Sequence, residues 1–151
     1  MGDCVPINSG QIWGEGLPLI PEKVYDLGFI DYSTMLMMGK SPKLVMRFNV
    51  VEQGEYFGIV LSKYYGLKKL TTKPKKSGGF YAGRLSDFLR DYFTFFPDQF
   101  ISRVDRIPMT RFKNVIVQGR VKTVTKGYNQ RNIPDQLQYS VIGELLYLKD
   151  I

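Results

Sequence analysis

Positively charged and aromatic side chains alternate in one stretch of the sequence, between residues 63 and 84. Proteins that hold single-stranded nucleic acid need both kinds of group, because cations contact the phosphates and aromatic rings stack on unpaired bases. The stretch contains no Asp or Glu, and its cations are Lys63, Lys68, Lys69, Lys73, Lys75, Lys76 and Arg84. The rings that could stack on bases are Tyr64, Tyr65, Phe80 and Tyr81. We therefore predict that this stretch binds single strands with weak sequence preference.

A second basic segment follows further along the chain. Val115, Val117 and Val121 alternate there with polar residues that include Arg120 and Lys122, a pattern that predicts a strand with one buried and one basic face. Arg120 and Lys122 join the predicted nucleic-acid contacts. Residues 63–131 carry a net charge of +12, against −3 for residues 1–62 and −2 for residues 132–151. An asymmetry of this size indicates a polyanionic partner.

Few residues are suited to catalysis. The chain has no histidine and one cysteine, Cys4, which excludes Ser-His-Asp catalysis and a thiolate zinc site. Carboxylates remain, and Asp26, Asp31, Glu52 and Glu55 would be the ligands of a metal-dependent nuclease, our alternative from the enzyme class. Their spacing matches no catalytic motif. We predict that the protein is not an enzyme and binds no metal.

The glycine-rich loop over residues 71–83 does not match a nucleotide-cofactor motif. It lacks the G-x-x-x-x-G-K-[ST] pattern that cradles phosphates, so we predict no cofactor. Its Pro, Gly and Lys content is typical of a loop. We predict a mobile finger in which Phe80 and Tyr81 lie outside the core.

Strands are predicted on both sides of a single helix. Apolar and polar residues alternate over residues 23–31 and 43–52, which is the period of a strand with one buried face. Apolar residues over 85–96 follow the period of an amphipathic helix, with Ser86 at its start and Pro97 after its end. The apolar face of that helix consists of Leu85, Phe88, Leu89, Tyr92 and Phe96. Residues 139–148 fit a buried strand and a short helix equally well.

This order of elements predicts a mainly β fold. A small barrel or half-open sheet with one helix, of the oligonucleotide-binding (OB) type, suits strands that precede and follow one helix. Residues 1–22 are rich in Gly and Pro and predict an irregular arm, so residues 23–151 would form a single domain.

The sequence also predicts a location. The longest run without Asp, Glu, Lys or Arg, residues 4–14, has eleven residues, fewer than the roughly 18 that span a bilayer. The N-terminus has no signal-peptide pattern. We expect a cytoplasmic protein that does not contact membranes.

Two segments resemble a known family. The run Phe48-x-Val50-x-x-x-Gly54-Glu55-Tyr56-Phe57-Gly58, followed by Leu61 and Tyr64-Tyr65, is similar to the central strand and following bend of OB-fold single-stranded-DNA-binding proteins of bacteriophages and mobile genetic elements. The segments 115–121 and 139–142 resemble their closing strands. The resemblance implies an accessory protein of replication or recombination. It carries over as binding residues Lys63, Tyr64, Tyr65, Arg120 and Lys122.

The partner predictions follow from charge and resemblance together. Single-stranded DNA is the expected ligand, with RNA as the competing nucleic acid. Self-association and contacts with replication or recombination proteins are further expectations. The alternative from the class of interaction proteins is a phage or plasmid protein whose basic face grips an acidic host protein, because charge complementarity does not distinguish phosphate from carboxylate.

Overall fold

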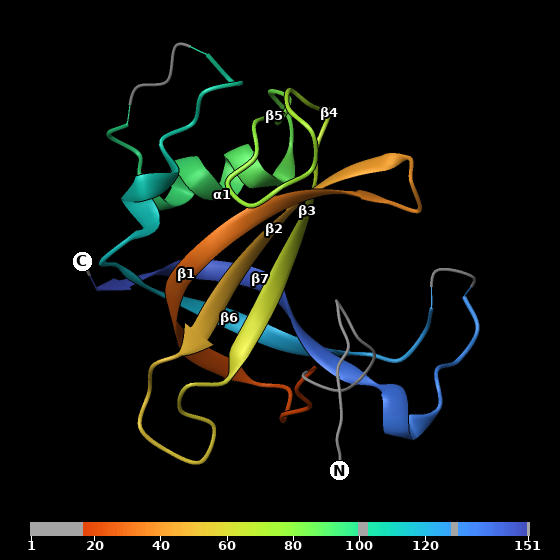
Figure 1. Ribbon diagram of the computed structural model, residues 1–151. Coiled ribbons are helices and arrows are strands. Elements are labelled where there is room, and N and C mark those ends of the chain that lie inside the picture. Colours follow the sequence, from red (N-terminus) through yellow and green to blue (C-terminus); the bar gives the residue numbers. More distant parts are fainter. Residues whose placement is uncertain (1–16, 100–102, 128–129, 151) are drawn as a thin grey trace.

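A five-stranded antiparallel sheet forms the centre of the protein in the computed structural model, which describes residues 17–99, 103–127 and 130–150 (Figure 1). The order of strands across the sheet is β3-β2-β1-β6-β7. Their bounds are β1 Val24–Met37, β2 Ser41–Val50, β3 Val60–Gly66, β6 Ile116–Val124 and β7 Tyr139–Asp150. Strands β1, β2 and β3 are sequential neighbours, and β6 returns to pair with β1, which is the Greek-key order.

The long strand β1 holds the two halves of the sheet together. Residues 24–28 pair with β6, and residues 27–37 pair with β2. The register with β2 shifts between Phe29 and Asp31, so Ile30 is the extra residue of a bulge, a feature that bends a strand. The edge strands β3 and β7 lie near each other without strand pairing between them in the described residues. The predicted mainly β class is confirmed, in the form of a half-open sheet.

Alternation of apolar and polar residues explains the strands. Leu44, Met46, Phe48 and Val50 of β2 are fully buried, whereas Arg47 between them is exposed. The predicted strands at 23–31 and 43–52 are confirmed, although β1 continues to Met37. The segment 139–148, which fitted strand and helix equally, belongs to strand β7.

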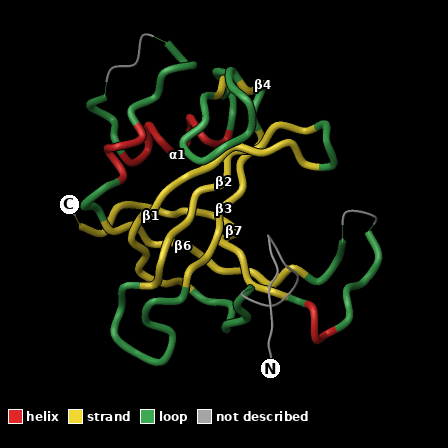
Figure 2. Tube along the Cα trace, viewed as in Figure 1, coloured by secondary structure: helices red, strands yellow, loops and turns green. Residues whose placement is uncertain are grey.

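Helix α1, Asp87–Phe95, covers one end of the sheet (Figure 2). Ser86 is its N-cap and accepts a hydrogen bond from the Leu89 backbone N–H. The predicted helix at 85–96 is confirmed with shorter bounds. Leu85 precedes the cap and is 99% exposed, so its assignment to the buried helix face is wrong.

Aromatic rings make up much of the core under α1. Tyr92 lies in its centre, with ring centroids of Phe88, Phe96 and Phe112 within 6.0, 5.1 and 5.7 Å of its own. Edge-to-face pairs of this kind contribute beyond the area that they bury. The rings of the helix and of Phe112 therefore form one packed cluster in the core.

The basic loop forms a small hairpin against β1. Strands β4, Lys69–Leu70, and β5, Phe80–Tyr81, pair with each other. The tip between them is bonded to β1, because the Thr34 N–H donates to the Lys75 carbonyl at 3.0 Å and the Ser77 N–H donates to the Tyr32 carbonyl at 2.9 Å. A mobile finger is therefore the wrong description of this loop.

Two 3-10 turns, Met109–Phe112 and Asp135–Leu137, complete the described elements. The predicted N-terminal arm is described only from Leu17 onward, and Cys4 lies outside the described residues. In the described part of the arm, the Pro18 carbonyl accepts a hydrogen bond from the Ser140 backbone N–H at 2.7 Å. Within the described part of the chain, no helix has the length and apolar character needed to cross a membrane.

Candidate nucleic-acid interface

One surface of the hairpin brings cations and an aromatic ring together. We call it the hairpin face, formed by Lys68, Lys69, Tyr81 and Arg84. The Lys68 N–H donates to the Tyr81 carbonyl at 2.9 Å, and Lys69 pairs with Tyr81 across the hairpin. As a result, the ammonium groups of both lysines lie 5.7 Å from the centroid of the Tyr81 ring, within the range of a cation–π contact.

The hairpin face is open to a ligand. Residues 66–68 and 81–86 line a concavity of about 650 Å³ beside it. Lys68, Lys69 and Arg84 are exposed, and no carboxylate of the described residues forms an ion pair with any of them. An incoming phosphate would therefore meet these cations without an acidic competitor.

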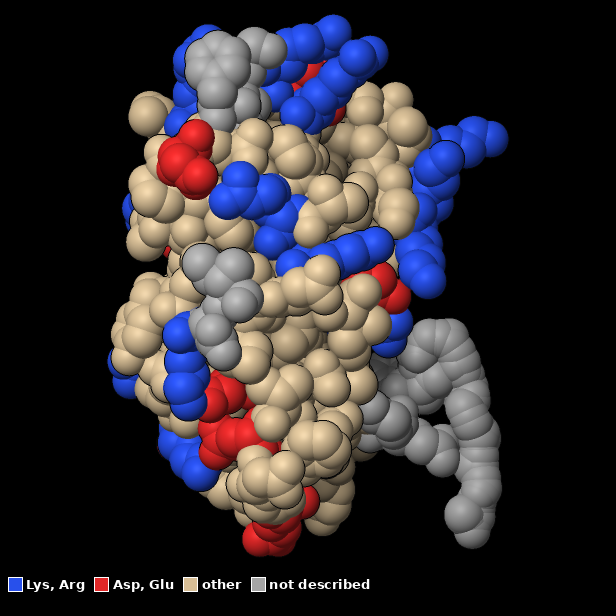
Figure 3. All heavy atoms as spheres, turned by 90° about the vertical axis from the view of Figure 1, so that its left-hand side faces the viewer, with Lys and Arg blue, Asp and Glu red and all other residues tan. Residues whose placement is uncertain are grey.

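The tip of the hairpin carries the remaining lysines of the basic stretch. Lys73 and Lys75 are exposed and, like the hairpin face, have no ion-pair partner among the described residues. Lys76 differs, since its Nζ lies 3.6 Å from Asp31 Oδ2. Figure 3 shows the left-hand side of the molecule in Figure 1, where Lys and Arg side chains gather over the upper half of the surface.

Asp31 and Arg47 form an ion pair between β1 and β2. Arg47 Nε and Nη2 each donate to a carboxylate oxygen of Asp31 at 2.7 Å. These hydrogen bonds from Arg47 hold the pKa of Asp31 below its ordinary value, with a smaller contribution from Lys76. The sequence alone did not point to Arg47, because only the register between β1 and β2 shows that it meets Asp31. Since this carboxylate already matches its charge, Arg47 does not join the candidate site.

The three adjacent candidates of β3 point to different sides. Tyr64 faces outward and is 39% exposed, whereas Tyr65 is 3% exposed. The Tyr65 hydroxyl donates to Asp91 Oδ2 at 2.7 Å, and burial raises the pKa of both groups. The Lys63 ammonium lies 4.3 Å from the centroid of the Tyr65 ring, where burial lowers its pKa. Tyr65 is therefore a core residue, and its prediction as a stacking group is wrong.

Phe80 is also a core residue. It is 6% exposed, and its ring packs edge-to-face against Tyr32 at 6.2 Å and Phe88 at 5.8 Å. Successive side chains of a strand point to opposite faces, so the burial of Phe80 turns Tyr81 outward. The expectation that both rings lie outside the core is wrong for Phe80.

The two predicted contacts on β6 lie on a different sheet from the hairpin. Arg120 and Lys122 are both exposed, as the alternation predicted. Arg120 Nε donates to Glu144 Oε1 of the neighbouring strand at 2.9 Å. Lys122 has no ion-pair partner in the described residues, and its aliphatic stem packs beside Gly143.

Three of the four carboxylates considered as metal ligands, Asp26, Asp31 and Glu52, have other partners. Asp26 accepts hydrogen bonds from Lys149 Nζ at 2.6 Å and from Gln118 Nε2 at 2.9 Å. Glu52 Oε1 accepts one from the Asp26 backbone N–H at 2.9 Å. A search of the described residues finds no group of three or more His, Cys, Asp or Glu that could hold a metal ion.

Comparison with protein-family models, with curated proteins and with solved structures finds no match for this chain. Its function is therefore inferred from the geometry and charge of its own surface.

Proposed function

We propose that this protein binds single-stranded DNA through the hairpin face, with phosphates at Lys68, Lys69 and Arg84 and a base on Tyr81. The observation that supports the proposal is the placement of two ammonium groups 5.7 Å from one partly exposed aromatic ring. A phosphate of a single strand could contact one of these lysines while the adjacent base stacks on the Tyr81 ring. Stacking accepts every base, so the expected sequence preference is weak.

The architecture is compatible with this ligand. OB folds are partly open, five-stranded Greek-key barrels that bind oligonucleotides, and this chain has a half-open Greek-key sheet of five strands. Together with the resemblance noted in the sequence, this supports a role as an accessory to replication or recombination of a phage or mobile element in the cytoplasm. Tyr64 on the outer face of β3 is a second stacking candidate.

The test is a salt-dependent binding titration. Labelled single-stranded DNA, the matching duplex and RNA of the same sequence are titrated at several salt concentrations. If Lys73 or Lys75 at the tip contacts phosphate together with the three cations of the hairpin face, four or five contacts form. Log affinity for single-stranded DNA should then fall with log salt at a slope of about −3, because each contact contributes about −0.7. Duplex DNA binding as tightly as single strands would contradict base stacking.

A charge-matched pair of variants locates the site. Lys68→Ala combined with Lys69→Ala should flatten the slope by about 1.4. The control, Lys23→Ala combined with Arg120→Ala, removes the same charge from cations that already pair with Glu52 and Glu144. Equal effects of the two variants would contradict the proposed site. Capture of one acidic protein after nuclease treatment, with no DNA retained, would favour the acidic-partner alternative.

A further inference from the structure

A pocket lies along one edge of β1, between the part of the strand that pairs with β6 and the part that is bonded to the hairpin tip. Pairing of β1 with β6 ends at Gly28, and pairing with the hairpin tip begins at Tyr32 and Ser33. Between these points, residues 29–31 have no strand on that edge among the described residues. The pocket at this open edge has a volume of about 430 Å³, which is within the range of roughly 300–1,000 Å³ for pockets that bind small molecules.

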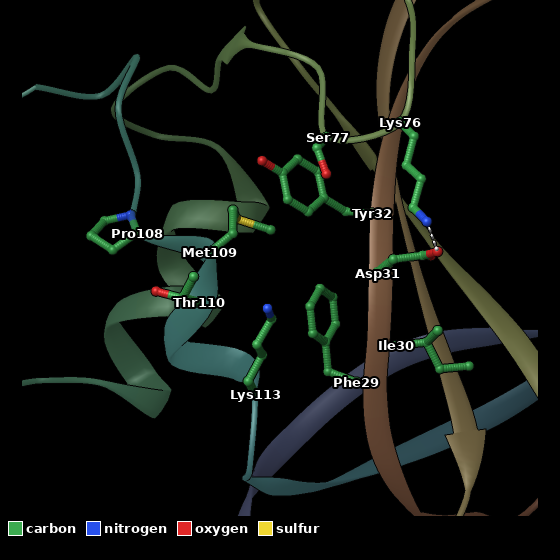
Figure 4. A pocket seen from close by; sticks show the side chains of 10 residues that line it. All are labelled: Phe29, Ile30, Asp31, Tyr32, Lys76, Ser77, Pro108, Met109, Thr110 and Lys113. Carbon is green, nitrogen blue, oxygen red and sulfur yellow. Dashed lines mark ion pairs between the residues drawn. The ribbon is translucent and has the colours of Figure 1, made fainter.

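The pocket has an aromatic and apolar interior, and two lysines, Lys76 and Lys113, also line it (Figure 4). Phe29 and Tyr32 project into it from β1, and Met109 faces them from the 3-10 turn. The Lys113 side chain points between Phe29 and Met109. Hydroxyl groups are present on Ser77 and Thr110, which also line the pocket. The interior therefore offers ring surface, and its rim offers a positive charge and hydrogen-bonding groups.

The acid that lines the pocket does not cancel this charge. The Asp31 carboxylate points away from Lys113, across β1, where Arg47 and Lys76 neutralise it. Lys113 itself has no ion-pair partner in the described residues. An anion that enters beside Phe29 would thus meet an unmatched cation.

We infer that this pocket holds one nucleotide unit of the bound strand, with its base against Phe29 and Tyr32 and its phosphate at Lys113. The inference rests on the proposed function, because a strand supplies that unit. Strand addition by a peptide fits less well, since the open edge has three residues and includes the Ile30 bulge, which interrupts the ladder that such a peptide would extend.

The first test uses ligands small enough to fill the pocket alone. Thymidine monophosphate, thymidine and inorganic phosphate are titrated by NMR at millimolar concentration. Lys113→Ala should weaken binding of the monophosphate about tenfold, the effect of losing one charge-assisted hydrogen bond, and change thymidine binding less than about twofold. Lys113→Arg should retain monophosphate binding. Lys126→Ala removes an exposed lysine that does not line the pocket and should have no effect.

A second variant fills the pocket without touching the core. Thr110 is exposed and lines the pocket, so Thr110→Trp should abolish binding of both thymidine and its monophosphate while thermal unfolding stays unchanged. Monophosphate binding that neither Thr110→Trp nor Lys113→Ala weakens would overturn the inference, as would no binding by the wild type. An acidic peptide that binds in place of the nucleotide would reassign the pocket to a protein partner.

The two proposals fail separately. Oligonucleotide binding that depends on Lys68 and Lys69, without any binding of the monophosphate, would leave the proposed function intact and remove the pocket from it. Monophosphate binding that depends on Lys113, without oligonucleotide binding, would retain the pocket and overturn the proposed function.

Discussion

The hairpin and the central sheet both carry exposed cations, but the two regions differ in whether carboxylates pair with these cations. On the hairpin, no carboxylate of the described residues pairs with Lys68, Lys69, Lys73, Lys75 or Arg84. On the sheet, carboxylates from adjacent strands pair with Arg47 at 2.7 Å and with Arg120 at 2.9 Å. Most exposed cations of the hairpin are therefore open to a polyanion, whereas, among the described residues, Arg47 and Arg120 of the sheet are already paired and Lys122 is the exception on β6.

This difference matters because a phosphate must compete with any carboxylate already in place. A cation that pairs with an acid has lost part of its attraction for a polyanion, whereas an unpaired cation in solution attracts counterions that binding releases. We therefore expect the salt dependence of binding to come mainly from the hairpin. The following predictions test this contrast.

The largest effect concerns the anchoring of the hairpin. Phe80→Ala should lower the free energy of unfolding by about 3–5 kcal/mol, as expected for loss of a buried phenyl ring. Tyr81→Ala, at the next position, removes an outward-facing ring and should cost only about 0.2–1 kcal/mol. Urea unfolding followed by circular dichroism measures both. Similar losses for the two variants would contradict the opposite orientation of these side chains.

The second effect concerns stacking on the hairpin. Tyr81→Ala should weaken binding of single-stranded DNA by about 1–3 kcal/mol. The salt slope should stay nearly unchanged, because stacking releases no counterions. Tyr147→Ala is the matched control, since Tyr147 is 55% exposed and lies on β7 of the central sheet. A change in slope for Tyr81→Ala would show that the ring acts by placing Lys68 and Lys69.

These outcomes separate what the sequence could and could not predict. Alternation predicted β1, β2 and β6, and helical period with Ser86 predicted α1, because these patterns are local. The ion pairs of the sheet could not be predicted in this way. Asp31 and Arg47 are sixteen residues apart, and they meet only because of the register between β1 and β2.

The same limit applied to the aromatic candidates. Tyr64 and Tyr65 are identical in type and adjacent in sequence, and only the face of β3 that meets α1 decides which one is buried. Phe80 lies in a segment with loop composition, so nothing local indicated that it reaches Phe88 in the helix. In contrast, the absence of acids between residues 63 and 84 was visible in the sequence and identified the region of unpaired cations.

The third effect comes from a substitution that leaves cations of the sheet unpaired, as they are on the hairpin. Asp31→Asn removes the carboxylate that pairs with Arg47 and Lys76. Freeing one or two cations should make the salt slope for single-stranded DNA steeper by about 0.7–1.4, if the strand passes over this face. Glu55→Gln removes the same charge from an exposed residue in the β2–β3 connection and should leave the slope unchanged. No difference between the two variants would confine the strand to the hairpin.

The smallest effect is on the pH dependence of stability, and it is confined to the sheet. Arg47 holds the pKa of Asp31 below its ordinary value in the folded protein, so the folded state binds this proton less tightly than the unfolded chain. The resulting stability is present above the ordinary aspartate pKa, near about 3.9, and is lost as the pH falls through the lower folded value. Asp31→Asn should therefore reduce the loss of stability below about pH 4, by about 1 kcal/mol or less because the Arg47 side chain is 48% exposed. Urea midpoints measured across this pH range test the prediction. Lys68→Ala combined with Lys69→Ala removes cations without acidic partners and should leave the fall of the urea midpoint at low pH unchanged. A change in that fall would show that the hairpin cations stabilise a carboxylate.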